Sequence, residues 1–96
     1  LPPYSHIGVV KVSCSIRQLA KMTLVNAAKL KKNKSIFVYG PAPSQTSKKN
    51  NQYFYQLIIG SESSSLLSKH ITRIKLYLSS MDKRIKWYID IDPIEQ

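Results

Sequence analysis

The chain has 96 residues, of which 43% are hydrophobic and only three are glycine, so its composition is that of a globular domain and excludes a disordered segment. Fifteen lysines and arginines against five acidic residues give a formal net charge of +10 and an isoelectric point of about 9.9. A charge of this size favours a polyanionic partner such as nucleic acid, or an anionic membrane surface, although a larger parent protein that balances the charge is an alternative.

Cysteine content and hydropathy exclude further classes. Cys14 is the only cysteine, so the chain forms no internal disulfide and no zinc site built from several cysteines. No apolar run approaches the roughly 20 residues of a membrane-spanning helix, and we expect no membrane partner. The chain starts with Leu-Pro-Pro-Tyr, without a methionine or a signal-peptide pattern. We therefore expect residues 1–96 to be a single domain cut from a longer protein.

The start of the chain predicts an extended lead-in followed by a strand. Residues 1–7 form the lead-in, because two prolines disfavour a helix there. Residues 8–16 alternate apolar and polar side chains, which is the pattern of a half-buried strand, and Cys14 is expected to be a small core residue.

A helix and a second strand follow. Residues 17–33 place their leucines and alanines on one arc of a helical wheel and their basic residues roughly opposite, with Ser15 as the expected N-cap. Residues 35–39 are β-branched and aromatic, which predicts a short strand, and the Gly-Pro-Ala-Pro at 40–43 is expected to end it. The polar residues 44–52 then predict a long exposed loop.

The second half of the chain adds a strand, a helix and a final strand. Residues 53–59 predict a third strand, and the serine-rich turn at 60–65 offers several N-caps for a helix over about 64–80. Apolar side chains at i, i+3, i+4 and i+7 spacing form a stripe along that helix. The last strand, residues 84–93, alternates strictly, so we expect Trp87 and its isoleucine neighbours to form a spine of the core.

The order strand, helix, strand, strand, helix, strand predicts an α+β fold of the split βαβ, or ferredoxin-like, type. We expect a four-stranded antiparallel sheet with spatial order 4-1-3-2 and both helices on one face, because right-handed crossovers place the first and third strands centrally. The other face of the sheet would stay open. The residues expected to line it are Lys11, Lys86 and Tyr88, with Tyr53 or Tyr55.

The sequence contains no P-loop, no glycine-rich dinucleotide turn and no nucleophile elbow. Asp90 and Asp92 could form a carboxylate pair or a magnesium site, but two carboxylates beside a chain end favour a structural or partner-facing role. His70 lies in the apolar stripe of the second helix, where a core-edge histidine with one hydrogen bond is favoured over a catalytic or metal-binding one. We therefore predict no catalytic residue, no metal site and no cofactor in this chain.

Recognition of RNA is another use of this fold, with aromatic side chains on the central strands that stack on bases. Tyr53, Phe54 and Tyr55 on the third strand suggest this use. The basic-Gly-aromatic signature of such proteins is absent, since Gln52 precedes the first tyrosine and no glycine lies among residues 52–55. Tyrosines on a sheet more often serve packing, so an RNA-binding module stays an alternative.

Three segments together resemble the C-terminal domain of the PriA family, the primosomal replication-restart DNA helicases. Residues 1–6, Leu-Pro-Pro-Tyr-Ser-His, resemble the family's Pro-Pro-aromatic entry. The Gly-Pro-Ala-Pro at 40–43 is followed by an aromatic strand that ends in Gln-Leu-Ile-Ile at 56–59. The Lys-Trp-Tyr-Ile-Asp-Ile-Asp-Pro at 86–93 is similar to the family's closing segment. The similarity covers essentially the whole chain, in order.

The resemblance implies a ribosomal S10-like fold and a bacterial, cytoplasmic protein that acts at stalled or abandoned replication forks. The parent would unwind DNA with ATP in the 3′–5′ direction and carry zinc-binding cysteines, all outside this chain, so the chain itself would be no enzyme. Its partners would be forked or single-stranded DNA and, through the parent, single-stranded DNA-binding protein and other primosome proteins. We expect a monomer.

The chain departs from the family's pattern at two places. The third strand lacks the usual arginine beside its tyrosine, and the second helix begins with serines at 63–65 instead of a basic residue that could contact single-stranded DNA-binding protein. We expect sequence-independent DNA binding that helps to position the helicase core; a stand-alone RNA-binding or ribosome-associated module, and a scaffold for the parent, are the alternatives. The expected DNA contacts are Lys48, Lys49, Lys83, Arg84 and Lys86, with Tyr53 and Tyr55.

Overall fold

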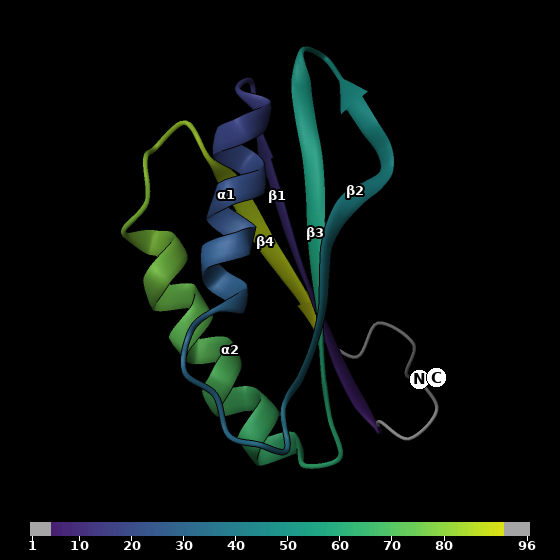
Figure 1. The fold of residues 1–96 in the computed structure, drawn as a ribbon, viewed down its shortest axis with the longest axis vertical. Helices are drawn as coiled ribbons and strands as arrows, with labels where there is room; N and C mark the ends of the chain where they lie inside the picture. The colour runs from purple at the N-terminus through teal and green to yellow at the C-terminus, as the bar shows by residue number, and fades with distance from the viewer. Residues whose placement is uncertain (1–4, 92–96) are drawn as a thin grey trace.

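The computed structural model describes residues 5–91, apart from the side chains of residues 45–49. Its elements follow the predicted order (Figure 1). They are β1 (His6–Cys14), α1 (Arg17–Ala28), β2 (Phe37–Lys49), β3 (Gln52–Ser61), α2 (Ser64–Ser79) and β4 (Lys86–Ile91). β1 begins at His6, within the segment predicted to be an extended lead-in.

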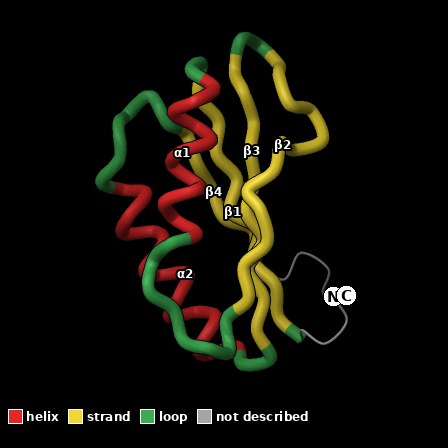
Figure 2. The backbone as a smooth tube through the Cα atoms, in the orientation of Figure 1, coloured by secondary structure: helices red, strands yellow, loops and turns green. Residues whose placement is uncertain are grey.

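The four strands form one sheet in the order β2-β3-β1-β4, and every neighbouring pair is antiparallel. This is the predicted order 4-1-3-2 read from the other edge, so the α+β class and the split βαβ topology are confirmed. Both helices lie on the same face of the sheet (Figures 1 and 2). Within the described part of the chain, no element covers the opposite face, which we call the open face.

The hydrophobic core lies between the sheet and the two helices. Alternate residues of β1 point into it, and Val10, Val12 and Cys14 are at most 2% exposed, so the predicted core position of the cysteine is confirmed. Burial of one such aliphatic side chain stabilises the fold by about 1.5–3 kcal/mol. The remaining strands and helices contribute further buried side chains, among them Ala20, Leu24, Ala27, Leu57, Ile59, Leu67, Ile71, Ile74 and Leu78.

The α1 helix is shorter than its hydrophobic pattern predicts. It ends at Ala28, where the amide of Lys29 bonds to the carbonyls of the preceding turn, and the Lys32 ammonium reaches back to the Ala28 carbonyl at 3.3 Å. Crowding of like charges in the lysine-rich segment that follows disfavours another helical turn. The N-cap is Ile16 without a side-chain bond, so the prediction of Ser15 is wrong: this serine lies one residue too early to cap the first turn.

The α2 helix agrees with its prediction in position and in buried face. Its N-cap is Ser63, whose hydroxyl oxygen accepts a hydrogen bond from the Leu66 amide at 3.2 Å. The stripe of Leu67, Ile71, Ile74 and Leu78 faces the sheet. The two helices are also joined through the Tyr77 hydroxyl, which donates to the Thr23 carbonyl at 3.2 Å.

The strand end predicted at residues 40–43 and the loop predicted over residues 44–52 are both wrong, because β2 continues to Lys49 and forms a long hairpin with β3. Only Asn50 and Asn51 form its turn, and both have positive φ, at 55° and 62°. This is the type I′ conformation that a two-residue hairpin requires, and asparagine adopts it more readily than most residues. β2 tolerates its prolines because it is an edge strand, and its register with β3 shifts after Tyr39 and after Pro43.

The last strand is also an edge strand, and this limits how deeply its aromatic residue is buried. Ile85 is 6% exposed, whereas Trp87 and Ile89 are only partly buried against the core and Ile91 is 48% exposed. Trp87 is therefore a flank of the core and not its spine, because neighbouring strands cover β4 on one side only. The predicted strand end, with Asp92, lies outside the described residues.

Candidate nucleic-acid interface

Basic residues from distant parts of the chain meet at one end of the sheet. Lys86 opens β4 and pairs with Ser13 near the end of β1, while the neighbouring Cys14 pairs with Tyr53 of β3. On the other side of β3, Lys48 lies opposite the same tyrosine. The hairpin tip and the start of β4 therefore share the end of the sheet at the top of Figure 1.

The separation of these basic positions fits a nucleic-acid backbone. Lys48 on β2 and Lys86 on β4 are three strand spacings apart in the sheet order, which is about 14 Å at roughly 4.8 Å per spacing. One strand of duplex DNA carries a phosphate every ~3.4 Å along the axis, so this span covers about four nucleotides. The backbone of Lys48 and Lys49 is placed by the sheet, whereas their side chains lie outside the described part, so their role stays a prediction.

The turn between α2 and β4 carries two more of the predicted contacts, and they differ in availability. The Asp82 carboxylate accepts hydrogen bonds from the Arg84 backbone amide at 2.9 Å and from its guanidinium at 2.7 and 3.0 Å. These bonds lower the pKa of Asp82 to about 2 and raise the pKa of Arg84. Lys83 is exposed between them. Lys83 can therefore meet a phosphate with its whole ammonium group, whereas Arg84 has two of its five N–H donors occupied by Asp82 and only the others available.

A shallow hollow on the open face adjoins this end of the sheet. It has a volume of about 180 Å³ and is lined by residues of β1, β2, β3 and β4. Lys11 and Tyr88 pair across β1 and β4, and the Lys11 ammonium lies 5.6 Å from the centroid of the tyrosine ring, which is 57% exposed. Phe54 and Lys86 also line the hollow. Exposed aromatic rings beside lysines can stack on bases while the ammonium groups meet phosphates.

The two tyrosines predicted for the open face do not lie there. Tyr55 is 8% exposed and belongs to the core, and Tyr53 is packed against the core with the Arg17 guanidinium 5.1 Å from its ring centroid. Both share the parity of Leu57, and successive side chains of a strand point to opposite faces. Residues 53, 55 and 57 alternate with Phe54 along the strand, so the apolar Leu57 was the signal in the sequence that Phe54, and not the tyrosines, lies on the open face. Because only 8% of its surface is exposed, Tyr55 has little ring surface to offer a base.

The sequence profile described as Primosomal protein N C-terminal domain matches residues 1–94. The chain belongs to this family. Two curated proteins named Replication restart protein PriA are similar to it: that of Buchnera aphidicola subsp. Acyrthosiphon pisum (strain APS) is 31% identical over 103 residues, and that of Haemophilus influenzae (strain ATCC 51907 / DSM 11121 / KW20 / Rd) is 27% identical over 96 residues. Each match covers 97% of the chain but only 14% and 13% of the relative, respectively. The chain thus corresponds to the C-terminal domain of a replication restart protein.

Solved structures with similar folds include proteins of quite different origin. The de novo designed protein Foldit4 superimposes with a TM-score of 0.73 at 10% identity, covering 90% of this chain and 93% of the design. The C-terminal DNA-binding domain of the latency-associated nuclear antigen of MHV-68 superimposes with a TM-score of 0.50 at 18% identity, covering 85% of this chain and 67% of that one. At such low identity these similarities concern the fold of the PriA C-terminal domain alone.

Other sites considered for this domain find no support among the described residues. Over residues 5–91, no three His, Cys, Asp or Glu side chains gather where they could hold a metal ion. Asp90 lies on β4, while Asp92 is outside the described range. Neither α1 nor α2 has the length and apolar character to cross a membrane.

Proposed function

We propose that this C-terminal domain binds DNA without sequence preference at replication forks and helps to position the helicase core of its parent. The observation that carries the proposal is the meeting of Lys86, Lys83 and the Lys48–Lys49 segment at one end of the sheet. These lysines lie on strands or in the turn before β4, and none of them is on a helix. Phosphate contacts are the mode of binding that this arrangement supports.

The longer protein supplies the remaining activities in this proposal. ATP-driven 3′–5′ unwinding and zinc binding belong to segments outside the chain, which spans 14% of its relative from Buchnera. Single-stranded DNA-binding protein and other primosome proteins would be met through that parent, in the bacterial cytoplasm. Its membership of the replication restart family supports this placing.

The proposal is tested by fluorescence anisotropy with forked, single-stranded and duplex DNA at several salt concentrations. We expect micromolar or weaker affinity that falls steeply with salt, because each neutralised phosphate releases counterions. Lys86→Ala should lower the log-log salt slope by about one unit on every sequence, and Lys48→Ala with Lys49→Ala by about two. Lys75→Ala, at an exposed position on α2 that does not line the hollow on the open face, is the matched control.

The exposed Tyr88 ring beside Lys11 favours a second candidate, a single-stranded RNA-binding module. The same titration separates the two functions. An affinity that does not change with salt concentration, that is higher for one base sequence, or that is higher for RNA than for each of the three DNA ligands would contradict the proposed function and favour this alternative.

A further inference from the structure

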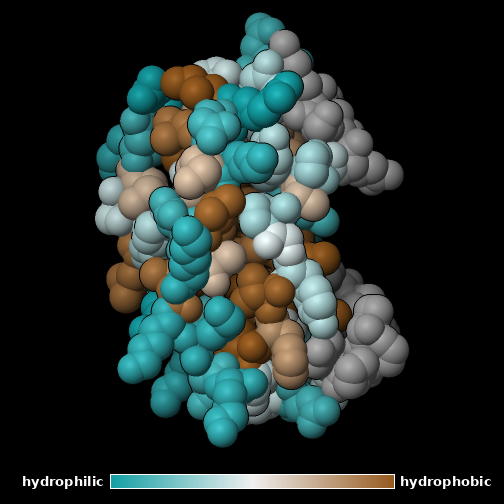
Figure 3. Space-filling view, in the orientation of Figure 1, coloured by the Kyte–Doolittle hydropathy of each residue, from teal (hydrophilic) through white to brown (hydrophobic). Residues whose placement is uncertain are grey.

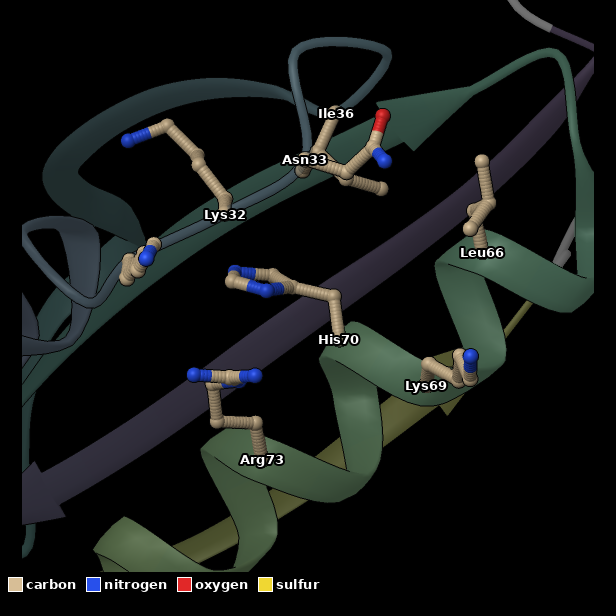
Figure 4. Close-up of a pocket in the computed structure, with 8 residues that line it drawn as sticks. Lys32, Asn33, Ile36, Leu66, Lys69, His70 and Arg73 are labelled. Carbon is tan, nitrogen blue, oxygen red and sulfur yellow. The ribbon is translucent and has the colours of Figure 1, made fainter.

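A second basic hollow lies on the helix side of the domain, away from the candidate interface. It has a volume of about 270 Å³ and opens between the α1–β2 connection and α2. Figure 4 shows His70 and Arg73 extending from α2 toward the segment that carries Lys32 and Asn33. The residues that line it are Lys31, Lys32, Asn33, Ile36, Leu66, Lys69, His70 and Arg73.

The charge of this hollow is of one sign. Two lysines come from the α1–β2 connection, and Lys69 and Arg73 come from α2, while the lining contains no carboxylate. Among the described residues, none of these four cations forms an ion pair, since the carboxylate–cation pair found there is Asp82 with Arg84. The Lys32 ammonium donates to the Ala28 carbonyl at 3.3 Å, which leaves its other hydrogens for a ligand. Cations brought together without counter-charges favour the binding of an anion.

His70 gives a second and independent indication of a ligand. Its side chain is only 5% exposed and lines the hollow, yet within the described part of the chain its ring makes no hydrogen bond. The expected core-edge position is therefore confirmed, but its expected hydrogen bond is not found. Burial lowers the pKa of His70, and the charges of Arg73 and Lys32 lower it further. The ring nitrogens of His70 are not among the buried side-chain atoms that are closed off without a partner, so they are reached from the hollow and can bond to a ligand there.

The location separates this hollow from the interface on the sheet. The α1–β2 connection and the first half of α2 lie in the lower half of Figure 1, whereas the start of β4 and the hairpin tip lie at the top. In the space-filling view, hydrophilic side chains cover the lower end of the molecule on the α2 side (Figure 3). An anion bound here would occupy a site distinct from Lys86 and Lys83.

We propose that this hollow is a phosphate-binding site. An arginine fork and several ammonium groups match the oxygens of a phosphate, and Ile36 and Leu66 provide apolar wall for the sugar or other group attached to it. The volume lies just below the roughly 300–1,000 Å³ of small-molecule sites, so it suits a phosphate with a small attached group. The phosphate comes from a nucleic-acid strand or from a free phosphate compound, and the site does not depend on the proposed function of the sheet surface.

The pKa of His70 can be measured to detect phosphate binding in this hollow. A bound phosphate places negative charge beside His70 and offers acceptors to its ring, so the pKa of this histidine should rise on binding. The ring signals of His70 are followed by NMR through a pH titration of the 96-residue chain with sodium pyrophosphate, and with sodium chloride at equal ionic strength. We expect pyrophosphate to raise the pKa of His70 by about one unit or more relative to chloride. The signals of His6, which does not line the hollow, report non-specific effects.

Matched variants locate the effect. Lys69→Gln with Arg73→Gln should abolish the pyrophosphate-dependent rise, whereas Lys75→Gln, on the same helix but outside the hollow, should preserve it. All three positions are exposed, so the fold should persist, and a circular dichroism melt checks this. Equal titration of His70 in pyrophosphate and chloride, or an unchanged rise in the double variant, would overturn the proposal.

Further titrations distinguish the sources of the phosphate. If a short single strand with a 5′-phosphate shifts the His70 signals more than the same strand without it, the ligand is a strand end, and if the two strands shift them equally, the ligand is a backbone phosphate. If pyrophosphate shifts the signals and neither strand does, the ligand is a free phosphate compound. All three results support the site. An acidic peptide that shifts His70 when pyrophosphate does not would overturn it in favour of a protein partner. If Lys86→Ala leaves DNA affinity unchanged while pyrophosphate still shifts His70, the proposed function fails and this site stands.

Discussion

At the scale of single residues, His70 and Asp82 show how local surroundings set charge in opposite ways. Burial lowers the pKa of the His70 ring and favours its neutral form, with neighbouring cations acting in the same direction. Asp82 is on the surface, and three hydrogen bonds from Arg84 favour its charged form. The histidine is therefore the residue whose charge should affect stability near neutral pH.

We expect acidification to destabilise the domain through His70. In the folded chain its pKa is below the value of about 6.5 that it has when unfolded, so the unfolded state binds more protons around and below that pH. The free energy of unfolding should therefore fall as the pH drops from about 7.5 through 6.5 towards the folded pKa. Urea unfolding at closely spaced pH values measures this slope.

Replacement of the ring tests the assignment. His70→Gln should flatten the dependence of stability on pH in this range, because the side chain that takes up the extra proton on unfolding is gone. His6→Gln controls for the loss of a histidine elsewhere. A free energy of unfolding of the wild-type chain that stays constant or increases as the pH is lowered from 7.5 to 5.5 would contradict the prediction.

The arrangement of residues at the candidate interface was only partly predictable from the sequence. The lysines could be identified as candidates because they lie in a polar segment before the third strand or at the start of the last strand. The engagement of Arg84 by Asp82 depends on a turn geometry that the sequence does not specify. The basic hollow was not predicted, because Lys32 and Arg73 lie far apart in the chain and meet only through packing of the α1–β2 connection against α2.

At the scale of elements, periodic hydrophobic patterns were reliable and irregular segments were not. The apolar stripe of α2 and the alternation of β1 correctly predicted both the elements and their buried faces. After Tyr39, β2 contains prolines, glycine and polar residues, so this part of its sequence is not typical of a strand. It is held as a strand by pairing with β3, a long-range interaction that local propensity does not report.

The hairpin turn offers a direct test of this reading. Asn51 has a φ of 62°, a left-handed conformation that costs most residues about 1–2 kcal/mol. Asn51→Ala should therefore lower the free energy of unfolding by about 1 kcal/mol, while Asn51→Gly should leave it unchanged or raise it, since glycine favours this position of a type I′ turn. Urea unfolding of both variants measures the difference. Equal stabilities of the alanine and glycine variants would show that the segment is a loop in solution.

At the scale of the whole molecule, the sequence predicts how much charge there is but not where it gathers. The net charge of +10 is distributed over at least two separate surfaces, one at the end of the sheet and one between the α1–β2 connection and α2. Few described cations are neutralised by carboxylates, since the ion pair found among them is Asp82 with Arg84. Repulsion within the folded domain should therefore reduce its stability.

Salt should relieve this repulsion and raise the melting temperature. The Debye length falls from about 30 Å at 0.01 M to about 10 Å at 0.1 M salt. The radius of gyration is 12.9 Å, so charges on the two surfaces interact across the domain at the lower concentration and are largely screened from one another at the higher one. If the repulsion is worth about 1 kcal/mol, the melting temperature should increase by about 4–8 °C. Differential scanning calorimetry in sodium chloride measures this increase.

A charge-reduced variant separates screening from specific anion binding. The double variant Lys21→Glu with Lys75→Glu changes two exposed helix positions that line neither hollow. Each substitution lowers the net charge by two units, so the formal net charge falls from +10 to +6. Its melting temperature should depend less on sodium chloride than that of the wild type, because less repulsion remains to be screened. Pyrophosphate at equal ionic strength should still stabilise this variant more than chloride, since the lining of the basic hollow is intact. A melting temperature that is independent of chloride in the wild-type chain would show that its positive charges are too far apart to destabilise the fold.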